Sequence, residues 1–142
     1  MSPRWEPDPD IRTGRHVACH LHAHLVFVTK YRRGVFDDDM LRRCEEIMRE
    51  VCGSFEVDLR EFNGETDHVH LLVHYPPKVA LSKLINALKG VSSRYLRAEY
   101  TGRINHIGRG SVFWSRSYFA GSCGGAPLTV IRQYIESQKR PV

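Results

Sequence analysis

Two histidines in this sequence are separated by a single residue within an apolar segment. His68 and His70 belong to the segment DHVHLLV at positions 67–73. Alternate side chains of a strand leave opposite faces, so both imidazoles leave the same face. Together they can bind one divalent metal ion, and a third oxygen ligand would leave coordination positions open for a substrate. Many such pairs are only exposed or hydrogen bonded, but polar groups are costly on the covered side of an apolar strand, which favours a metal site.

A second group of histidines, His20, His22 and His24, lies earlier in the chain. They alternate with apolar residues across positions 19–29, which is typical of a strand. If this strand neighbours the one that carries the first pair, one face of the sheet is rich in imidazole. We expect His24 to support the metal site or to contact a phosphate, and His20 and His22 to be exposed. In an alternative interpretation, these three residues form a metal site of their own.

Tyr134 and Gln138 are four residues apart near the end of the chain. In a helix this spacing places both side chains on one face, while Leu128, Ile131 and Ile135 form an apolar stripe that packs. On spacing alone the tyrosine is typical of a rim residue and the glutamine of a surface residue.

The elements that must position these residues follow from hydrophobic periodicity. Helix 37–53 begins at a cap formed by the acidic residues 37–39 and ends at Gly53, and Asn63-Gly64 predicts a tight turn between two strands. We expect strands at 19–29, 55–62, 69–75 and 111–120, and helices at 37–53, 79–100 and 128–139. The order β-α-β-β-α-β-α predicts an α+β fold: a ferredoxin-like (RRM-like) antiparallel sheet with two helices on one face, plus a C-terminal helix that carries the tyrosine.

The length of 142 residues suits one domain. Residues 1–15 contain three prolines and no apolar pattern, so we expect a mobile N-terminal tail followed by a single domain over 16–142, with the glycine-rich connector 121–127 before the last helix. Apolar runs fall far short of the roughly 20 residues that cross a bilayer, which predicts a cytoplasmic protein with no membrane partner. The four cysteines lack CxxC spacing and are expected to be reduced, mostly buried thiols.

A formal net charge of +5 makes a polyanionic partner plausible. Basic residues follow the first strand and line the second long helix, where they are candidate phosphate contacts or simply solvated: Lys30, Arg32, Arg33, Lys83, Lys89 and Arg94. Phe113, Trp114 and Tyr118 either stack on unpaired bases or belong to the core. No glycine-rich phosphate loop is present, so we expect no nucleotide cofactor.

From about His20 to Gln138 the sequence resembles the single-strand DNA transposases of the HUH, single-tyrosine type, the insertion sequence 200/605 family. Five segments carry the resemblance in order: HLVFVTKYRR at 24–33, DHVHLLV at 67–73, LKGVSSR at 88–94, FWS at 113–115 with Tyr118, and YIESQ at 134–138.

The resemblance implies that His68, His70 and Gln138 bind Mg²⁺ or Mn²⁺ and that Tyr134 is the nucleophile. It implies cleavage of single-stranded DNA at imperfect hairpins at the ends of a mobile element, through a 5′-phosphotyrosine intermediate that a 3′-OH later resolves. It also implies a homodimer in which the tyrosine helix can complete the partner subunit's active site. Asp67 and His24 are candidate supporting residues beside the metal.

The sequence is also compatible with two other functions. One is a non-enzymatic module that binds single-stranded nucleic acid on a ferredoxin-like fold, which needs the basic and aromatic residues but neither Tyr134 nor the histidine pair. The other is a domesticated relative that performs the same chemistry on repetitive chromosomal palindromes.

Overall fold

The protein contains a four-stranded antiparallel sheet. The computed structural model describes residues 12–13, 18–19, 21–102, 112–123 and 128–141. Within them the sheet order is β4-β5-β3-β6, and every pair of neighbours is antiparallel. The strands are β3 (His22–Thr29), β4 (Asp58–Gly64), β5 (His68–His74) and β6 (Trp114–Ser122). This is the ferredoxin-like order that the sequence predicted.

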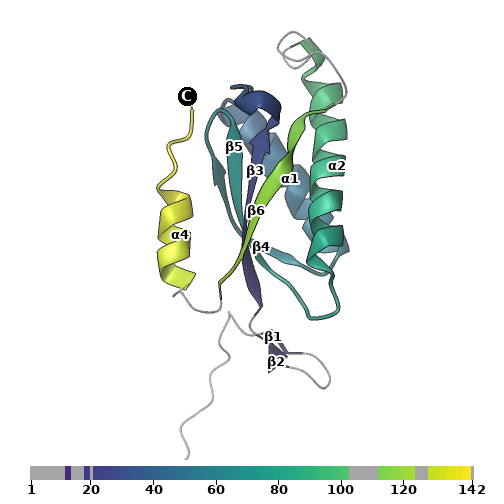
Figure 1. Cartoon of the computed structure of the whole chain (residues 1–142), viewed down its shortest axis with the longest axis vertical. Helices are drawn as coiled ribbons and strands as arrows, with labels where there is room; N and C mark the ends of the chain where they lie inside the picture. The colour runs from purple at the N-terminus through teal and green to yellow at the C-terminus, as the bar shows by residue number, and fades with distance from the viewer. Residues whose placement is uncertain (1–11, 14–17, 20, 103–111, 124–127, 142) are drawn as a thin grey trace, which may run out of the picture.

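Helices cover both faces of this sheet (Figure 1). The long helices α1 (Asp38–Ser54) and α2 (Leu81–Glu99) lie on one face, and the short helix α4 (Leu128–Glu136) lies on the other. The two amphipathic helices on one face and the additional C-terminal helix confirm the predicted fold class. His24, His68 and His70 belong to the face on which α4 lies.

Local sequence explains the beginning of α1. Asp37 caps the helix, because its carboxylate accepts a hydrogen bond from the backbone N–H of Met40 at 2.9 Å. Asp38 and Asp39 in the first turn add favourable charge at the positive end of the helix dipole. The apolar stripe of α1 is buried as predicted.

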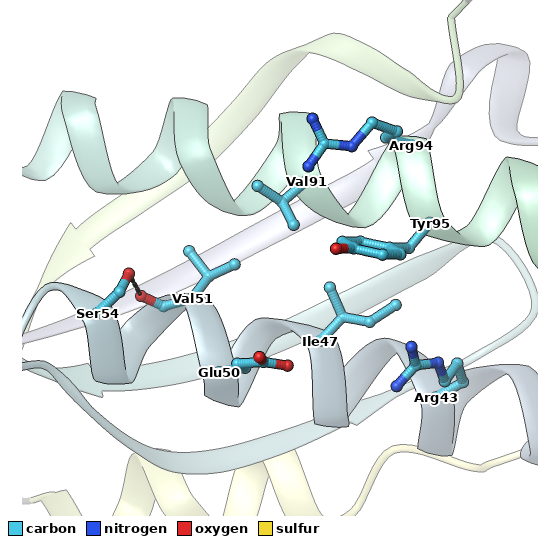
Figure 2. A pocket seen from close by; sticks show the side chains of 8 residues that line it. All are labelled: Arg43, Ile47, Glu50, Val51, Ser54, Val91, Arg94 and Tyr95. Atoms are coloured by element: carbon cyan, nitrogen blue, oxygen red, sulfur yellow. Dashed lines mark hydrogen bonds between the residues drawn. The ribbon is translucent and has the colours of Figure 1, made fainter.

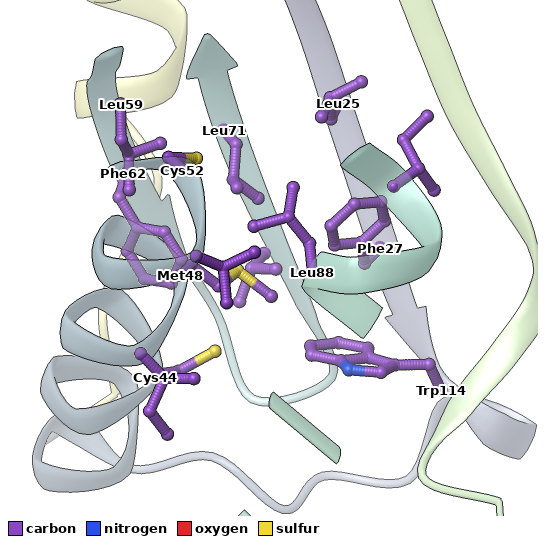
Figure 3. Close-up of a cluster of buried hydrophobic side chains, with 14 of the residues drawn as sticks. Leu25, Phe27, Cys44, Met48, Cys52, Leu59, Phe62, Leu71, Leu88 and Trp114 are labelled. Atoms are coloured by element: carbon purple, nitrogen blue, oxygen red, sulfur yellow. The ribbon is translucent and has the colours of Figure 1, made fainter. Parts of the chain in front are cut away.

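The main core lies between the sheet and the α1–α2 layer (Figure 3). Leu25, Phe27 and Leu71 from the sheet are fully buried there. Cys44, Cys52 and Cys123 are free and buried, as predicted for this protein; the side chain of Cys19 lies outside the described residues. Burial is the main cause that raises the pKa of Cys52 to about 12, so this thiol is protonated and inert at neutral pH.

The predicted turn at Asn63-Gly64 is wrong. Both residues belong to β4, Gly64 pairs with Val69 of β5, and the chain turns at positions 65–67. A Cβ on Gly64 would lie 2.5 Å from the carbonyl oxygen of His68, so the glycine permits the close approach of two strands. The Asn63 side chain is buried and serves another element, described below.

Several predicted element bounds also shift. The first long strand begins at His22 rather than Cys19, because Ala18–Cys19 pairs separately with Arg12–Thr13. The second strand begins at Asp58 rather than at 55, and the last runs over Trp114–Ser122. Helix α4 ends at Glu136 rather than 139. The rest of the predicted N-terminal tail and the Gly124-Gly125 connector lie outside the described residues.

Candidate active site

An open pocket of about 550 Å³ lies on the sheet face that α4 covers in part. Strands β3 and β5, the 3-10 turn η1 (Lys30–Arg32) and the chain around α4 all contribute to it. The pocket is lined by His24, Val26, Val28, Arg32, His68, His70, Phe119, Tyr134 and Gln138. The structure thus brings the predicted histidine pair, tyrosine and glutamine together within one chain.

Asp67 determines which nitrogen of His68 is available. Its carboxylate oxygen Oδ1 lies 2.7 Å from His68 Nδ1, so it accepts the hydrogen bond that this nitrogen donates. The other ring nitrogen, Nε2, lies 3.3 Å from Oε1 of Gln138. This arrangement places Asp67 where the sequence suggested a supporting residue.

The orientation of the Gln138 amide follows from a second contact. Its Nε2 donates to the backbone carbonyl of Tyr134 at 3.3 Å, so Oε1 is the atom that faces His68. Both Oε1 and an unprotonated His68 Nε2 offer lone pairs. Either a proton or a cation must therefore lie between them, and a cation bound to both atoms would satisfy both lone pairs.

His70 is held by His24 from the neighbouring strand. His24 Nε2 lies 3.0 Å from His70 Nδ1, with ring centroids 5.3 Å apart. Burial is the largest cause that lowers the pKa of His70 to about 4, followed by its proximity to His68 and His24, whereas a hydrogen bond with Gln138 acts in the opposite direction. Burial also lowers the pKa of His24. His70 is thus neutral at pH 7, the form that can bind a metal ion.

Tyr134 lies at the mouth of the pocket. Its ring centroid is 5.5 Å from that of His70 and 6.0 Å from that of His24, in edge-to-face contacts. The residue is 53% exposed, so the side chain is accessible to a macromolecular substrate. Ile131 and Ile135 of the same helix pack against Leu72, as the predicted apolar stripe requires.

Asn63 attaches the end of α4 to the sheet, a role that the sequence analysis missed. Its Nδ2 donates to the carbonyl oxygens of Ile135 at 3.2 Å, Glu136 at 3.4 Å and Gln138 at 3.2 Å, at the end of the helix, where carbonyl groups lack partners within the helix. Arg140 adds a hydrogen bond to Asp38 at 2.9 Å. Tyr134 and Gln138 are therefore positioned by polar contacts from the same chain.

The donor set fits a divalent metal ion. Among the described residues, no group of three or more His, Cys, Asp or Glu side chains could hold a metal, so such an ion would depend on the amide oxygen of Gln138 besides His68 and His70. Two imidazole nitrogens and one neutral oxygen leave the charge of the ion uncompensated. That set suits binding of an anionic phosphate at the open positions.

The predicted basic residues are divided between two sides of the molecule. Arg32 lines the pocket, and its Nε lies 3.6 Å from Asp67; Lys30 and Arg33 flank it in the chain. The residues on α2 lie on the opposite side of the sheet: Lys83 is exposed, and Arg94 borders a groove between α1 and α2 (Figure 2). Lys89 donates to the Ser115 carbonyl at 2.7 Å, and burial lowers its pKa.

Trp114 is a core residue, so its interpretation as a base-stacking residue is wrong. It is 3% exposed, and its indole N–H donates to Ser92 Oγ at 2.9 Å. The aromatic residue of β6 that lines the pocket is Phe119, 55% exposed and in edge contact with His24. Its position two residues before Gly121, on the face opposite Tyr118, could have been read from the strand alternation.

His22 is buried, whereas the sequence predicted an exposed residue. Its ring stacks on that of His74, with centroids 4.1 Å apart, and Arg60 Nη2 lies 2.8 Å from His74 Nδ1. His22 and His24 therefore belong to two different clusters. Because His22 stacks on His74 and His24 contacts His70, these two residues do not form the alternative metal site built on His20, His22 and His24; His20 itself lies outside the described residues.

Comparisons with known proteins agree with this fold. Residues 17–138 match the family model described as transposase IS200 like. The transposase for insertion sequence element IS200 of Salmonella typhimurium is 32% identical over 129 residues, which cover 91% of this chain and 84% of that protein. The ISDra2 transposase TnpA of Deinococcus radiodurans is 28% identical, with 91% of each chain covered.

Solved structures show the same architecture. A crystal structure of a suggested transposase from Deinococcus radiodurans R1 superposes with a TM-score of 0.72 and 28% identity, covering 91% of this chain and 98% of that one. A REP-associated tyrosine transposase, solved bound to a REP hairpin, shares only the fold, with a TM-score of 0.57 and 9% identity over 88% of this chain and 68% of that one. Fold and comparisons together define a DNA transposase. The chain belongs to the IS200-like transposase family.

Proposed function

We propose that this protein cleaves and rejoins single-stranded DNA at hairpin-containing ends of a mobile element, with Tyr134 as the nucleophile. The observation that carries the proposal is the convergence of an accessible phenol, two imidazoles and an amide oxygen in one pocket. A binding module without enzymatic activity would not require Asp67 and His24 to orient the two imidazoles.

In the proposed reaction, each bond that forms is matched by one that breaks, and the proton is accounted for. Tyr134 Oη attacks the scissile phosphorus, the bond between phosphorus and O3′ breaks, and the products are a 5′-phosphotyrosine and a free 3′-OH. The phenol loses one proton and the leaving oxygen gains one. Because one phosphodiester replaces another, attack by a second 3′-OH reverses the step and joins strands without a nucleotide cofactor.

His68 Nε2, His70 Nε2 and Gln138 Oε1 would hold Mg²⁺ or Mn²⁺. A phenol is protonated at neutral pH and is a weak nucleophile, so its attack needs neutralisation of the phosphate charge, which the bound ion supplies. Asp67 and His24 keep the Nε2 atoms directed at that position. The fixed Gln138 amide keeps its oxygen there.

The substrate strand would bind through its phosphates near η1, which follows the end of β3. Arg32 lines the pocket, and Lys30 and Arg33 lie within two residues of it in the chain, so these three residues would carry more of this binding than the α2 residues on the opposite side of the sheet. A homodimer that exchanges tyrosine helices remains part of the proposal, since the resemblance implies it. Light scattering on the purified protein tests it, and a mass of one chain would contradict it.

The proposal is tested by incubating the protein with labelled single-stranded oligonucleotides from the DNA that flanks its gene, with Mn²⁺ or with EDTA. We expect Mn²⁺-dependent cleavage of a hairpin-containing strand and none of the same sequence as a duplex. His70→Ala should lose cleavage, whereas Tyr118→Phe, a change of an exposed tyrosine outside the pocket, should retain it. Binding without cleavage by the wild-type protein would instead identify a binding module.

A further inference from the structure

Tyr31 is an exposed aromatic residue at the edge of the candidate active site. Tyr31 is 73% exposed, the highest value among the large apolar and aromatic residues that are described as exposed. Lys30 Nζ lies 5.3 Å and Arg33 Cζ 5.2 Å from the centroid of its ring. The following residue, Arg32, lines the pocket with His68, His70 and Tyr134. An aromatic face between two cations is therefore adjacent to the proposed reaction centre.

The backbone that presents this ring adopts an unusual conformation. Tyr31 and Arg32 have φ angles of 60° and 52°, in the left-handed region that residues other than glycine seldom occupy. Contacts on both sides hold the turn: Thr29 Oγ1 donates to the Arg33 carbonyl at 2.8 Å, and Lys30 N donates to the Phe113 carbonyl at 2.9 Å. The conformation is thus imposed by the surrounding structure, which is common at binding sites.

We propose that Tyr31 is a stacking platform for one unpaired nucleobase of the strand that enters the pocket, with Lys30 and Arg33 binding the phosphates on either side of that base. This proposal rests on the proposed function, because it names a contact for the same substrate. Every base has a π-face, so the contact tolerates any sequence. The side chains of Lys30 and Arg33 are long, so they can leave the tyrosine ring and bind a phosphate when a base stacks on that ring.

The chemistry of the three residues favours a nucleic acid over a protein partner. Two cations within reach of one exposed ring match the alternation of base and phosphate along a single strand. In duplex DNA the bases are paired and stacked, so their faces cannot reach the ring. The site should therefore prefer single strands, as the neighbouring pocket requires.

The test measures binding apart from chemistry. Fluorescence anisotropy with a labelled single-stranded oligonucleotide is recorded in EDTA, in a Tyr134→Phe background that cannot form an adduct. Tyr31→Asn removes the ring and keeps a residue that tolerates a positive φ, and Tyr31→Phe keeps the ring. We expect Tyr31→Asn to weaken binding about tenfold and Tyr31→Phe to stay within about twofold of the parent, as loss of one stacked base predicts.

Tyr95→Asn is the matched control. Tyr95 is also exposed and also has an arginine over its ring, Arg94 at 5.4 Å, but it lies in the α2 layer away from the pocket. Its loss should leave affinity unchanged. The salt dependence separates the roles: Lys30→Ala and Arg33→Ala should each reduce the slope of log Kd against log salt concentration by about 0.7, and Tyr31→Asn should not.

Three results would overturn the proposal. Unchanged affinity of a folded Tyr31→Asn protein, while the parent binds the strand, removes the stacking site and leaves the proposed function intact. An equal loss in Tyr31→Phe assigns the contact to the hydroxyl group instead. Absence of any binding of single-stranded DNA by the parent contradicts both the stacking site and the proposed function.

Discussion

His24 Nε2 lies 3.0 Å from His70 Nδ1, so the two imidazoles share one hydrogen bond across the β3–β5 pair. If His70 Nδ1 donates, its Nε2 keeps a lone pair for a metal ion, and His24 must accept at Nε2. Asp67 acts in the same way on His68. The two candidate ligands are therefore oriented by one carboxylate and one histidine.

Loss of His24 should weaken metal binding. His24→Ala removes the acceptor that fixes His70, and supporting residues of this kind typically contribute 10- to 100-fold to metal affinity. We expect the Kd for Mn²⁺, measured by calorimetry, to rise at least about tenfold, with partial rescue in His24→Asn. The Tyr95→Asn protein serves as the control. An unchanged Kd in His24→Ala would show that His70 is held without its neighbour.

Loss of the Asn63 amide should loosen α4. Asn63→Asp keeps the shape of the side chain but replaces the N–H donor with a charge that the helix C-terminus disfavours. Such a loss costs about 1–3 kcal/mol, so we expect amide hydrogen exchange in 128–136 to quicken by roughly fivefold or more. Exchange in α2 should not change. Equal protection of α4 in both proteins would refute the anchoring role.

Substitution of Trp114 should lower the free energy of unfolding and leave DNA binding nearly unchanged. Trp114→Phe leaves Ser92 without its indole donor and opens space in the core, for a cost of about 2 kcal/mol or more. Urea denaturation measures this difference in the free energy of unfolding. Under native conditions the affinity for single-stranded DNA should stay within about twofold of wild type. A large loss of affinity without destabilisation would restore the base-stacking interpretation.

Local patterns were enough for much of the fold. The cap at Asp37 and the apolar stripe that follows it depend only on neighbours in the sequence, so α1 was predicted with its bounds nearly correct. The same holds for the shared face of His68 and His70, since alternation is a property of any strand. The resemblance added Tyr134 and Gln138, which spacing alone would have assigned to the rim and the surface.

Contacts between distant segments could not be predicted in this way. Asn63 was interpreted as a turn residue because its role depends on carbonyls more than 70 positions away. His22 was expected to be exposed because its partner, His74, is set by strand register. Trp114 was ambiguous until Ser92 of another element provided its acceptor. Each error concerns a polar or aromatic side chain whose partner is remote in sequence.

The most direct test of the account is to identify the covalent intermediate. The protein is incubated with Mn²⁺ and a hairpin-containing single strand, denatured, digested and analysed by mass spectrometry. We predict a nucleotide attached to the peptide that contains Tyr134, and no adduct with Tyr134→Phe, whereas Tyr118→Phe forms it normally. An undiminished adduct in Tyr134→Phe, or attachment at another residue, would contradict the assignment of Tyr134 as the nucleophile.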